Sequence, residues 1–464
     1  MTEIVSEIVE ILKSSNDLLE VELKILRLFS SLLCEVLGTS LERLDQELVK
    51  DADVKVLRRD QRTIQFLFGE VTFKRRLVEE TTGCHVYLLD RHLGIKPRKR
   101  YSPLLLARVS GLASKGVMRM VASAVNLLTP TSMSHQKVAG VIKEAGARVD
   151  NYQRQQEVND TGKKRNKPAI LYLEGDAFSV KQQAFHHNRQ IRNLFVHRFQ
   201  IYEGIRKNGK RRELINRHII SSLDRQQAMK EVSEYLQAHY DLKKTIIISG
   251  SDNGSGYEAE VFKELAPDCL KQEHFLDQYH LNRKIQERLS FDSELIKPLK
   301  KAVYSWNWDQ VTAVLDTAES RITNEDQASQ EKQMALRKLK KYLKRNWQYI
   351  KPAELRGLKK PNGLGSCESN HRRYTYRLKR QGRSWSKAGL KAMLRIIDAQ
   401  QNGGLVEAMR FKELAKRFTH QVKDKLSSLK LFEKVQAPHI GVLQGRIVQD
   451  APSSSAIGRL AKIF

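Results

Sequence analysis

The sequence is poor in cysteine and has no long apolar run, and each shortage excludes a class of protein. Its four cysteines, at positions 34, 84, 269 and 367, lie far apart without a Cys-x-x-Cys pair. That spacing indicates neither a zinc cluster nor a disulfide framework, so we expect free, reduced thiols. No apolar stretch reaches the roughly 18 residues of a membrane-spanning helix, and residues 1–7 are acidic rather than signal-like. We therefore expect a cytoplasmic protein without a membrane partner.

Acidic side chains are too few to balance the basic ones. The 464 residues contain 82 Lys and Arg against 53 Asp and Glu, which leaves a formal net charge of +29. Such an excess attracts polyanions, so nucleic acid is the expected partner. The length and the 40% hydrophobic content predict roughly two to four folded units with a sizeable core.

The first hundred residues change their hydrophobic period. Residues 3–48 repeat Ile, Leu and Phe mostly at three- and four-residue steps, which is typical of amphipathic helices. They predict a helical leader over residues 1–50 that would suit dimerisation. From position 55 the pattern becomes strand-like: two segments meet at Gly69-Glu70 as in a hairpin, and residues 85–89 would complete a small sheet.

The next segment is basic and then helical, with a break at Thr129-Pro130-Thr131. On a basic chain this pattern suits a helix-turn-helix, but a plain helical hairpin has the same pattern, so both interpretations stay open. We expect residues 51–150 to form a small sheet plus a DNA-binding helical region, followed by a basic linker over residues 151–168. Phosphate contacts are expected from Arg98, Lys99 and Arg100, and base readout from Ser134, His135, Gln136 and Lys137.

Residues 169–180 are an apolar run that leads directly into two carboxylates. The run is apolar on both faces, as expected for a central strand packed on two sides. Tyr172, Glu174 and Asp176 share one face of an extended chain, and burying two carboxylates is costly unless they are protonated, paired or bound to metal. A metal site is the functional interpretation. A strand end whose acids lie in water is the alternative.

The remaining pattern predicts a mixed sheet interrupted by helices. Over residues 169–289, five strand patterns and several helical patterns follow one another, and the fourth strand ends on Asp252. Residues 290–362 are charged and helical and indicate an insertion. Residues 363–420 would supply the final helices, with Glu368 in a first turn, where an acid is often only a helix-dipole partner. A basic tail over residues 421–464 would follow.

Three carboxylates stand out by their context, namely Asp176, Asp252 and Glu368. An RNase H-like sheet places its first and fourth strands side by side, so the first two acids could meet while a late helix delivers the third. Three oxygen donors suit Mg²⁺, and two such ions can assist phosphodiester cleavage. The expected fold class is therefore α/β: an RNase H-like mixed sheet core with a helical insertion, preceded by a small α+β region that contains a helix-turn-helix candidate.

Eight segments, taken together and in order, resemble one family. They span most of residues 60–390 and are similar to the ISLre-type bacterial insertion-sequence transposases, once grouped as an uncharacterised protein family and distantly similar to Mutator-type elements. The segments are Arg62-Thr-Ile-Gln-Phe-Leu-Phe-Gly-Glu-Val-Thr-Phe-Lys-Arg, Tyr87-Leu-Leu-Asp, Met133-Ser-His-Gln, Glu174-Gly-Asp, Tyr202-Glu-Gly, Ser249-Gly-Ser-Asp, Leu276-Asp-Gln-Tyr-His-Leu-Asn and Glu368-Ser-Asn-His.

This resemblance implies a DDE transposase that cleaves phosphodiesters at element ends and joins the freed 3′-OH to target DNA. It implies that Asp176, Asp252 and Glu368 are catalytic and bind two Mg²⁺ or Mn²⁺ ions. Asp277 and His280 match a motif that Mutator-type enzymes carry beside their active site. The family commonly has Asp-Gly where this chain has Gly175-Asp176, so Glu174 stays open as the alternative first acid.

The implied partners are DNA, at the element ends and at the target, and further copies of the chain assembled on that DNA. Arg372 and Arg373, just after Glu368, are expected to contact DNA as well. Two other functions fit the same charge. One is a noncatalytic nucleic-acid-binding protein whose acids pair with basic neighbours, and the other is a structure-specific nuclease on the same fold. Metal binding that disappears when Asp176 is neutralised would exclude the noncatalytic alternative.

Overall fold

The computed structural model describes residues 2–159, 165–183, 193–209, 211–323, 326–358, 364–380 and 382–410. Within these ranges it describes the backbone but not the side chains of residues 2, 157–159, 211 and 366–370. The chain divides into two units, residues 1–414 and 415–464. The tail expected over residues 421–464 therefore lies outside the described residues.

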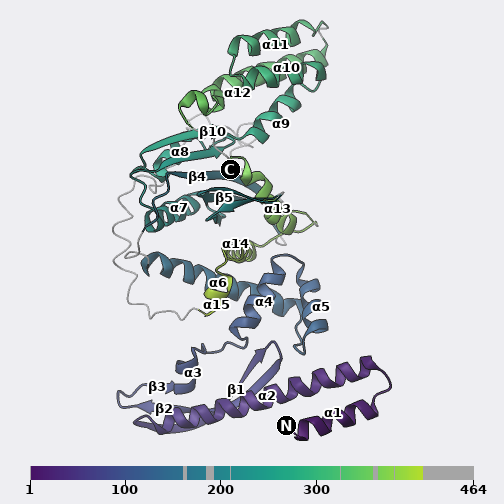
Figure 1. Ribbon diagram of the computed structural model, residues 1–464, viewed down its shortest axis with the longest axis vertical. Helices are drawn as coiled ribbons and strands as arrows, with labels where there is room; N and C mark the ends of the chain where they lie inside the picture. Colours follow the sequence, from purple (N-terminus) through teal and green to yellow (C-terminus); the bar gives the residue numbers. More distant parts are fainter. Residues whose placement is uncertain are drawn as a thin grey trace, which may run out of the picture. The chain divides into compact units, whose positions relative to one another are not determined.

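The N-terminal region joins two helices to a three-stranded antiparallel sheet (Figure 1). Asp17 caps helix α2 (Leu18–Lys50), which follows α1 (Thr2–Ser14) and packs on strand β2 (Gly69–Glu80). Strand β1 (Val54–Phe66) pairs with β2, and β3 (His85–Tyr87) completes the sheet. The third strand is shorter than the predicted 85–89, because the chain enters helix α3 (Leu88–Leu93) and buries Leu89.

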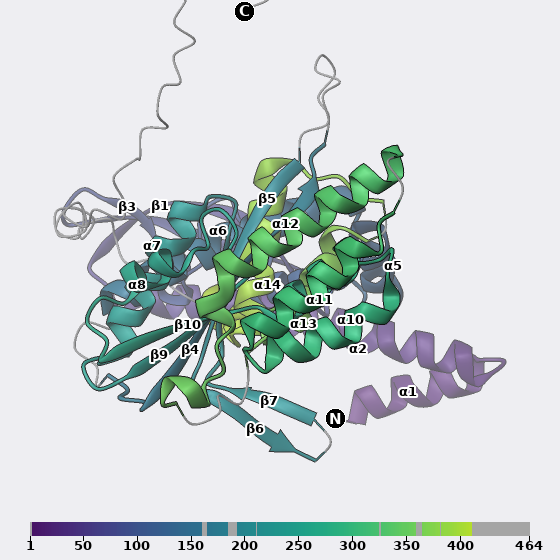
Figure 2. The ribbon, with the colours of Figure 1, turned by 90° about the horizontal axis from the view of Figure 1, so that it is seen from above.

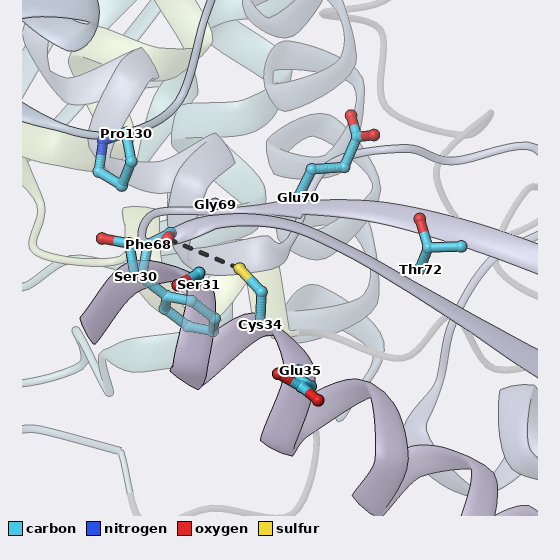
Figure 3. Close-up of a pocket in the computed structure, with 9 residues that line it drawn as sticks. All are labelled: Ser30, Ser31, Cys34, Glu35, Phe68, Gly69, Glu70, Thr72 and Pro130. Carbon is cyan, nitrogen blue, oxygen red and sulfur yellow. Dashed lines mark hydrogen bonds between the residues drawn. The ribbon is translucent and has the colours of Figure 1, made fainter. Parts of the chain in front are cut away.

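A shallow groove lies between α2 and the turn that joins β1 to β2 (Figure 3). It is lined by Ser30, Ser31, Cys34, Glu35, Phe68, Gly69, Glu70, Thr72 and Pro130. The Cys34 thiol donates to the Phe68 carbonyl at 3.7 Å, and burial raises its pKa. A raised pKa disfavours the thiolate, which is the reactive form of cysteine.

Three helices follow the basic stretch. Ser102 caps α4 (Pro103–Ala113), then α5 (Met118–Leu128) ends before Thr129, and α6 (His135–Asn159) packs against both. The break predicted at residues 129–131 is confirmed. The linker predicted over residues 151–168 is wrong as far as residue 159, because α6 continues through it and packs on helix α14 (Lys387–Gln401).

The central sheet has five strands in the order β10-β9-β4-β5-β8. Strands β4 (Ile170–Lys181), β9 (Ile246–Ser251) and β10 (Lys271–Leu276) run parallel, whereas β5 (Asn193–Tyr202) and β8 (His218–Ser222) add antiparallel pairings. The first strand of this sheet thus pairs with the fourth. A separate hairpin, β6 (Gly204–Asn208) with β7 (Arg211–Ile215), leaves the sheet.

The third of the five strand patterns predicted over residues 169–289 covers residues 213–220, and the structure divides it between β7 and β8. Asn216 adopts a φ of 49°, a left-handed conformation that ends an extended chain and that asparagine tolerates better than most residues. The two halves consequently belong to different sheets. Sequence periodicity alone does not reveal such a break.

Helices cover the central sheet on both faces. Phe262 of α8 (Ala259–Leu265) and Phe199 of β5 crowd the face on which Gly175 lies, where an added Cβ would come within 2.7 Å of the Phe199 ring. The other face packs Phe178 and Val180 against a core built by α4, α5, α6, α14 and α13 (Ser366–Leu378). Helix α7 (Arg225–His239) packs on β5 and β8, and α15 (Leu405–Arg410) packs on α4 and α6.

The insertion predicted over residues 290–362 is helical in its described part. It contains α10 (Ser293–Tyr304), α11 (Trp308–Ser320), α12 (Gln327–Ile350) and the short η2 (Glu354–Arg356). With α9 (Gln278–Arg288) these helices enclose their own apolar core, and α12 contacts β10 (Figure 2). Among the described helices, none combines the length and the apolar character needed to cross a membrane.

Candidate active site

Three aspartates occupy matching positions on three neighbouring parallel strands. Asp176 lies inside β4, whereas Asp252 and Asp277 directly follow β9 and β10. Glu174 of β4 pairs with Gly250 of β9, and Ser251 of β9 pairs with Leu276 of β10. Continuing the β4–β9 register by two residues sets Asp176 opposite Asp252. Continuing the β9–β10 register by one residue sets Asp252 opposite Asp277. The Asp277 amide donates to the Ser251 carbonyl at 2.7 Å, which supports the extended register. Because positions that pair in neighbouring strands share a face, the three acids gather at one edge.

Asp176 is only partly buried and lies against helix α13. Its Oδ2 is 3.1 Å from Nε2 of the buried His371, and its Oδ1 accepts from the Ala177 amide at 2.6 Å. The His371 ring packs edge-on against Phe178 two residues along the strand. A buried imidazole therefore fixes one oxygen of a carboxylate that still reaches solvent.

Glu174, the alternative first acid, is engaged in folding contacts. Its side chain is buried, Oε1 accepts from the Tyr202 hydroxyl, and Oε2 accepts from the Gly365 amide at 3.2 Å. Tyr202 in turn stacks on Tyr172. Both oxygens of Glu174 thus hold β4 to β5 and to the start of α13, which favours Asp176 as the acid available to a ligand.

Asp252 begins a tight loop that is tied to the insertion. Its Oδ1 accepts from the Gly254 amide at 2.9 Å. The next residue, Asn253, adopts a φ of 52° and donates from Nδ2 to Oδ1 of the buried Asn346 of α12 at 2.6 Å. Burial, assisted by the charge of Asp252, raises the pKa of Tyr342 on α12 to about 12. Helix α12 therefore forms one wall beside Asp252.

Asp277 caps helix α9 and pairs with His280. Its Oδ1 accepts from the His280 amide at 3.0 Å and lies 3.4 Å from Nδ1 of the ring. Bonding to Asp277 raises the pKa of His280, and the charges of Asp176 and Asp252 act in the same direction. Burial opposes ionisation of Asp277, yet the bonds from His280 outweigh it and lower the pKa of that carboxyl. The pKa of His280 thus responds to the charges of all three aspartates.

Glu368 lies in helix α13, and its side chain is outside the described residues. Contacts made by two neighbouring residues of the chain still indicate where position 368 lies. Gly365, at the helix start, bonds to Glu174, and His371 contacts Asp176. Residues three apart on a helix are neighbours, so position 368 falls between these two contacts and next to β4.

The sequence has recognisable relatives along almost its whole length. Over residues 12–415 it matches the uncharacterised protein family UPF0236. The chain belongs to this family. A UPF0236 protein from the 3′ region of vanSb in Streptococcus gallolyticus is 37% identical over 463 residues, which cover 99% of each chain. One from Caldanaerobacter subterraneus is 22% identical over 404 residues, 85% of this chain and 80% of its own, and eleven locus designations make up its name.

One solved structure has a distant likeness to this UPF0236 chain. It is the Drosophila P element transposase strand transfer complex, with 11% identity and a TM-score of 0.29 over 68% of this chain and 96% of that chain. A TM-score this low does not define a shared fold.

The donor chemistry of the UPF0236 chain suits a hard divalent cation. Asp176, inside β4, and Asp252, just after β9, are carboxylates on adjacent strands, and both are only partly buried. Oxygen donors of this kind are what Mg²⁺ and Mn²⁺ prefer. Among the side chains that the structure describes, no three His, Cys, Asp or Glu residues form a group able to hold a metal. The third predicted ligand, Glu368, is not among those side chains.

The predicted DNA-binding residues lie in three places. Arg98 and Arg100 are exposed, whereas Lys99 pairs with Glu144 at 3.4 Å. Ser134 caps α6 by accepting from the Lys137 amide at 3.3 Å, and the side chains of His135, Gln136 and Lys137 are exposed. Arg372 and Arg373 follow His371 on α13 and are exposed, with Arg373 donating to Gln401.

Three residues that border the acids were not predicted from the sequence, namely His371, Tyr342 and Asn346. His371 had a usable signal, because it lies one helical turn after Glu368 in the segment Glu368-Ser-Asn-His. Tyr342 and Asn346 had no such signal. The local sequence of α12 does not indicate that this helix packs beside a loop some ninety residues earlier in the chain.

Proposed function

We propose that this UPF0236 chain is a DDE transposase of the ISLre type, with an RNase H-like core. It binds the ends of an insertion sequence, cleaves phosphodiesters with divalent metal, and joins the freed 3′-OH to target DNA. The observation that carries the proposal is the shared register of Asp176, Asp252 and Asp277 at one sheet edge. The order of the five strands, with two parallel and two antiparallel pairs of neighbours, sets the first strand beside the fourth, as expected of an RNase H-like core.

The names of relatives give independent support. A protein whose name joins eleven loci of one strain is encoded repeatedly in that genome, and other C. subterraneus relatives carry four and two loci. Genes repeated in this way are typical of mobile elements. A structural or housekeeping DNA-binding protein gives no reason for such multiplication.

Asp176, Asp252 and Glu368 are proposed to hold two Mg²⁺ or Mn²⁺ ions. When bound, such ions activate the attacking oxygen and stabilise charge on the leaving oxygen. The chain's own contribution is to gather the acids and orient them. His371 fixes Oδ2 of Asp176, while Asp277 and His280 support the edge from the third strand.

DNA binding is proposed to rest on the large positive charge and on the region over residues 51–150. Arg98 and Arg100 would contact phosphates, which position a duplex without reading its sequence. The exposed start of α6 would read bases. Arg372 and Arg373, one turn beyond position 368, would hold the strand near the acids.

A noncatalytic nucleic-acid-binding protein is the second candidate, and one observation favours it. Asp176 and Asp277 each have a histidine within 3.4 Å, as expected if the acids only pair with basic neighbours. A structure-specific nuclease would share the acids but would not need repeated loci in a genome. The two enzymes differ in whether a cleaved end is joined to another duplex.

The proposal is tested with purified protein, a labelled duplex carrying an element end, and Mg²⁺ or Mn²⁺. We expect metal-dependent nicking followed by strand transfer. Asp252→Asn and Glu368→Gln should lower the nicking rate by about a thousandfold or more while end binding persists, because each removes a ligand charge with little change of shape. Nicking that is unaffected in Asp252→Asn would refute the catalytic assignment, and nicking without strand transfer would favour the nuclease.

A further inference from the structure

Helix α2 has two apolar faces between Leu18 and Val36, and only one of them is covered. Helix α1 packs alongside α2 (Figure 1). The half-buried apolar residues of this stretch follow one stripe, formed by Val21, Ile25, Leu28 and Leu32. With 3.6 residues per turn, a second stripe lies almost opposite. We call it the outer seam; its members are Leu19, Leu23, Leu26, Ser30 and Leu33. Its leucines are exposed, whereas Ser30 is half-buried where it borders the groove at the β1–β2 turn.

The outer seam is unusually exposed for apolar side chains. Leu19 is 67% exposed, Leu23 46%, Leu26 58% and Leu33 50%. A surface helix of a globular protein normally has a single apolar stripe. A row of four exposed leucines on one helix therefore marks an interaction surface.

The spacing of the outer seam is that of a coiled coil. Its members alternate steps of four and three residues, so they occupy the a and d positions of a heptad repeat. Glu22 and Arg27 then fall on the two flanks, at a g position and at the following e position. Both are exposed, and neither makes an ion pair or hydrogen bond within the described part of the chain. In a parallel pair of identical helices, the residue at the g position of one helix faces the residue at the following e position of the other, so Glu22 would face Arg27 of the second copy.

The charge of the segment that contains α1 and the first half of α2 indicates which kind of partner it binds. Residues 2–36 contain seven acidic and three basic side chains, a net charge of 3 − 7 = −4 within a chain of +29. Such a segment repels nucleic acid and anionic lipid alike. A protein surface can offer apolar side chains to the leucines and opposite charges to the flanking residues. A second copy supplies both at once, since Glu22 of one copy meets Arg27 of the other.

We infer that the outer seam is a self-association site, through which two copies pair their α2 helices in parallel about a two-fold axis. The pairing is isologous, so the same leucines and the same Glu22–Arg27 contact occur twice. It requires no DNA and no metal. The inference is therefore independent of the proposed catalytic function.

The first test measures the mass of the full-length protein in solution, without DNA, by light scattering and sedimentation. We expect a dimer at moderate salt. Leu23→Glu with Leu26→Glu should raise the dimer dissociation constant by more than about a hundredfold without loss of helix by circular dichroism. The matched control is Leu127→Glu with Leu128→Glu on α5, whose side chains are 82% and 79% exposed; this variant should stay dimeric.

The second test exchanges the flanking charges. Glu22→Lys and Arg27→Glu should each weaken self-association, because like charges then face each other across the seam. An equimolar mixture of the two variants should recover the dimer, since each unlike pair is attractive again. A monomeric wild-type chain, a dimer that survives the two Leu→Glu changes, binding to neutral phospholipid vesicles in place of dimerisation, or no recovery in the mixture would each overturn the inference.

Discussion

The bond between Asn253 and Asn346 should couple the insertion to the acidic edge. Asn346 is fully buried and accepts from Asn253 at 2.6 Å while donating to the Tyr342 carbonyl at 2.9 Å. A typical hydrogen bond contributes about 1 kcal/mol net, and a buried donor left without its acceptor costs about 1–3 kcal/mol. Asn346→Ala should therefore destabilise the chain by about 2–4 kcal/mol.

A double-mutant cycle isolates the pair. In Asn253→Ala with Asn346→Ala the stranded donor is gone, so the combined loss should be smaller than the sum of the single losses by about 1–2 kcal/mol. Urea unfolding followed by tryptophan fluorescence is suitable, because Trp347 adjoins Asn346 on α12. The matched control is Asn307→Ala, which removes the cap of α11, should cost about 1 kcal/mol, and should add independently to Asn253→Ala.

The cycle also has a functional readout. Loss of the tether should lower metal-dependent nicking, because the loop that carries Asp252 is no longer held against α12. If the two asparagine changes add within about 0.3 kcal/mol, or if Asn346→Ala nicks DNA at the wild-type rate, helix α12 does not position Asp252 and the reasoning is wrong.

Three further predictions concern other parts of the chain. His280→Ala should lower the rate of strand transfer by about 10–100-fold while binding to element ends stays intact. Strand transfer at the wild-type rate would mean that His280 is an ordinary surface residue with no role at the site. Burial lowers the pKa of His274 to about 3 from 6.5, so folding favours the neutral ring. The contribution of His274 to the free energy of unfolding is therefore complete above pH 6.5. It is lost as the pH falls toward 3, by up to about 1.4 kcal/mol per pH unit. His274→Gln should reduce the slope of urea-unfolding stability between about pH 6 and 4, and an unchanged slope would contradict the assignment. Gln136→Ala with Lys137→Ala should relax the preference of the chain for element ends over random duplex in a competition assay, whereas an unchanged preference would remove base readout from α6.

The strands of the core were easier to predict from the sequence than the way in which those strands pair. The apolar run over residues 169–180 and the strand ending near Asp252 were confirmed as β4 and β9, because period and composition are local properties. The register that sets Asp176 against Asp252 joins residues 76 positions apart, and it depends on pairing that no local pattern encodes. That the first and fourth strands adjoin was an expectation from an RNase H-like topology, and the sheet order agrees with it.

The errors have equally physical causes. The polar composition of residues 151–159 suggested a linker, but the segment is a helix because one side of it packs on the following helices. The division of the 213–220 strand depends on the backbone of a single residue, Asn216. The role of Glu174 in bonding Tyr202 and Gly365 could not be separated from that of Asp176 by spacing, because both acids lie on the same face of the strand.

The most direct test of the central claim compares two neighbouring acids on that strand. Asp176→Asn and Glu174→Gln are assayed at equal folded concentration for Mg²⁺-dependent nicking of a labelled element end. We expect Asp176→Asn to lose about three orders of magnitude or more in nicking rate while still binding the end, and Glu174→Gln to keep most of its activity despite lower stability. Retained nicking in Asp176→Asn, or a Glu174→Gln protein that is equally inactive, would contradict the claim.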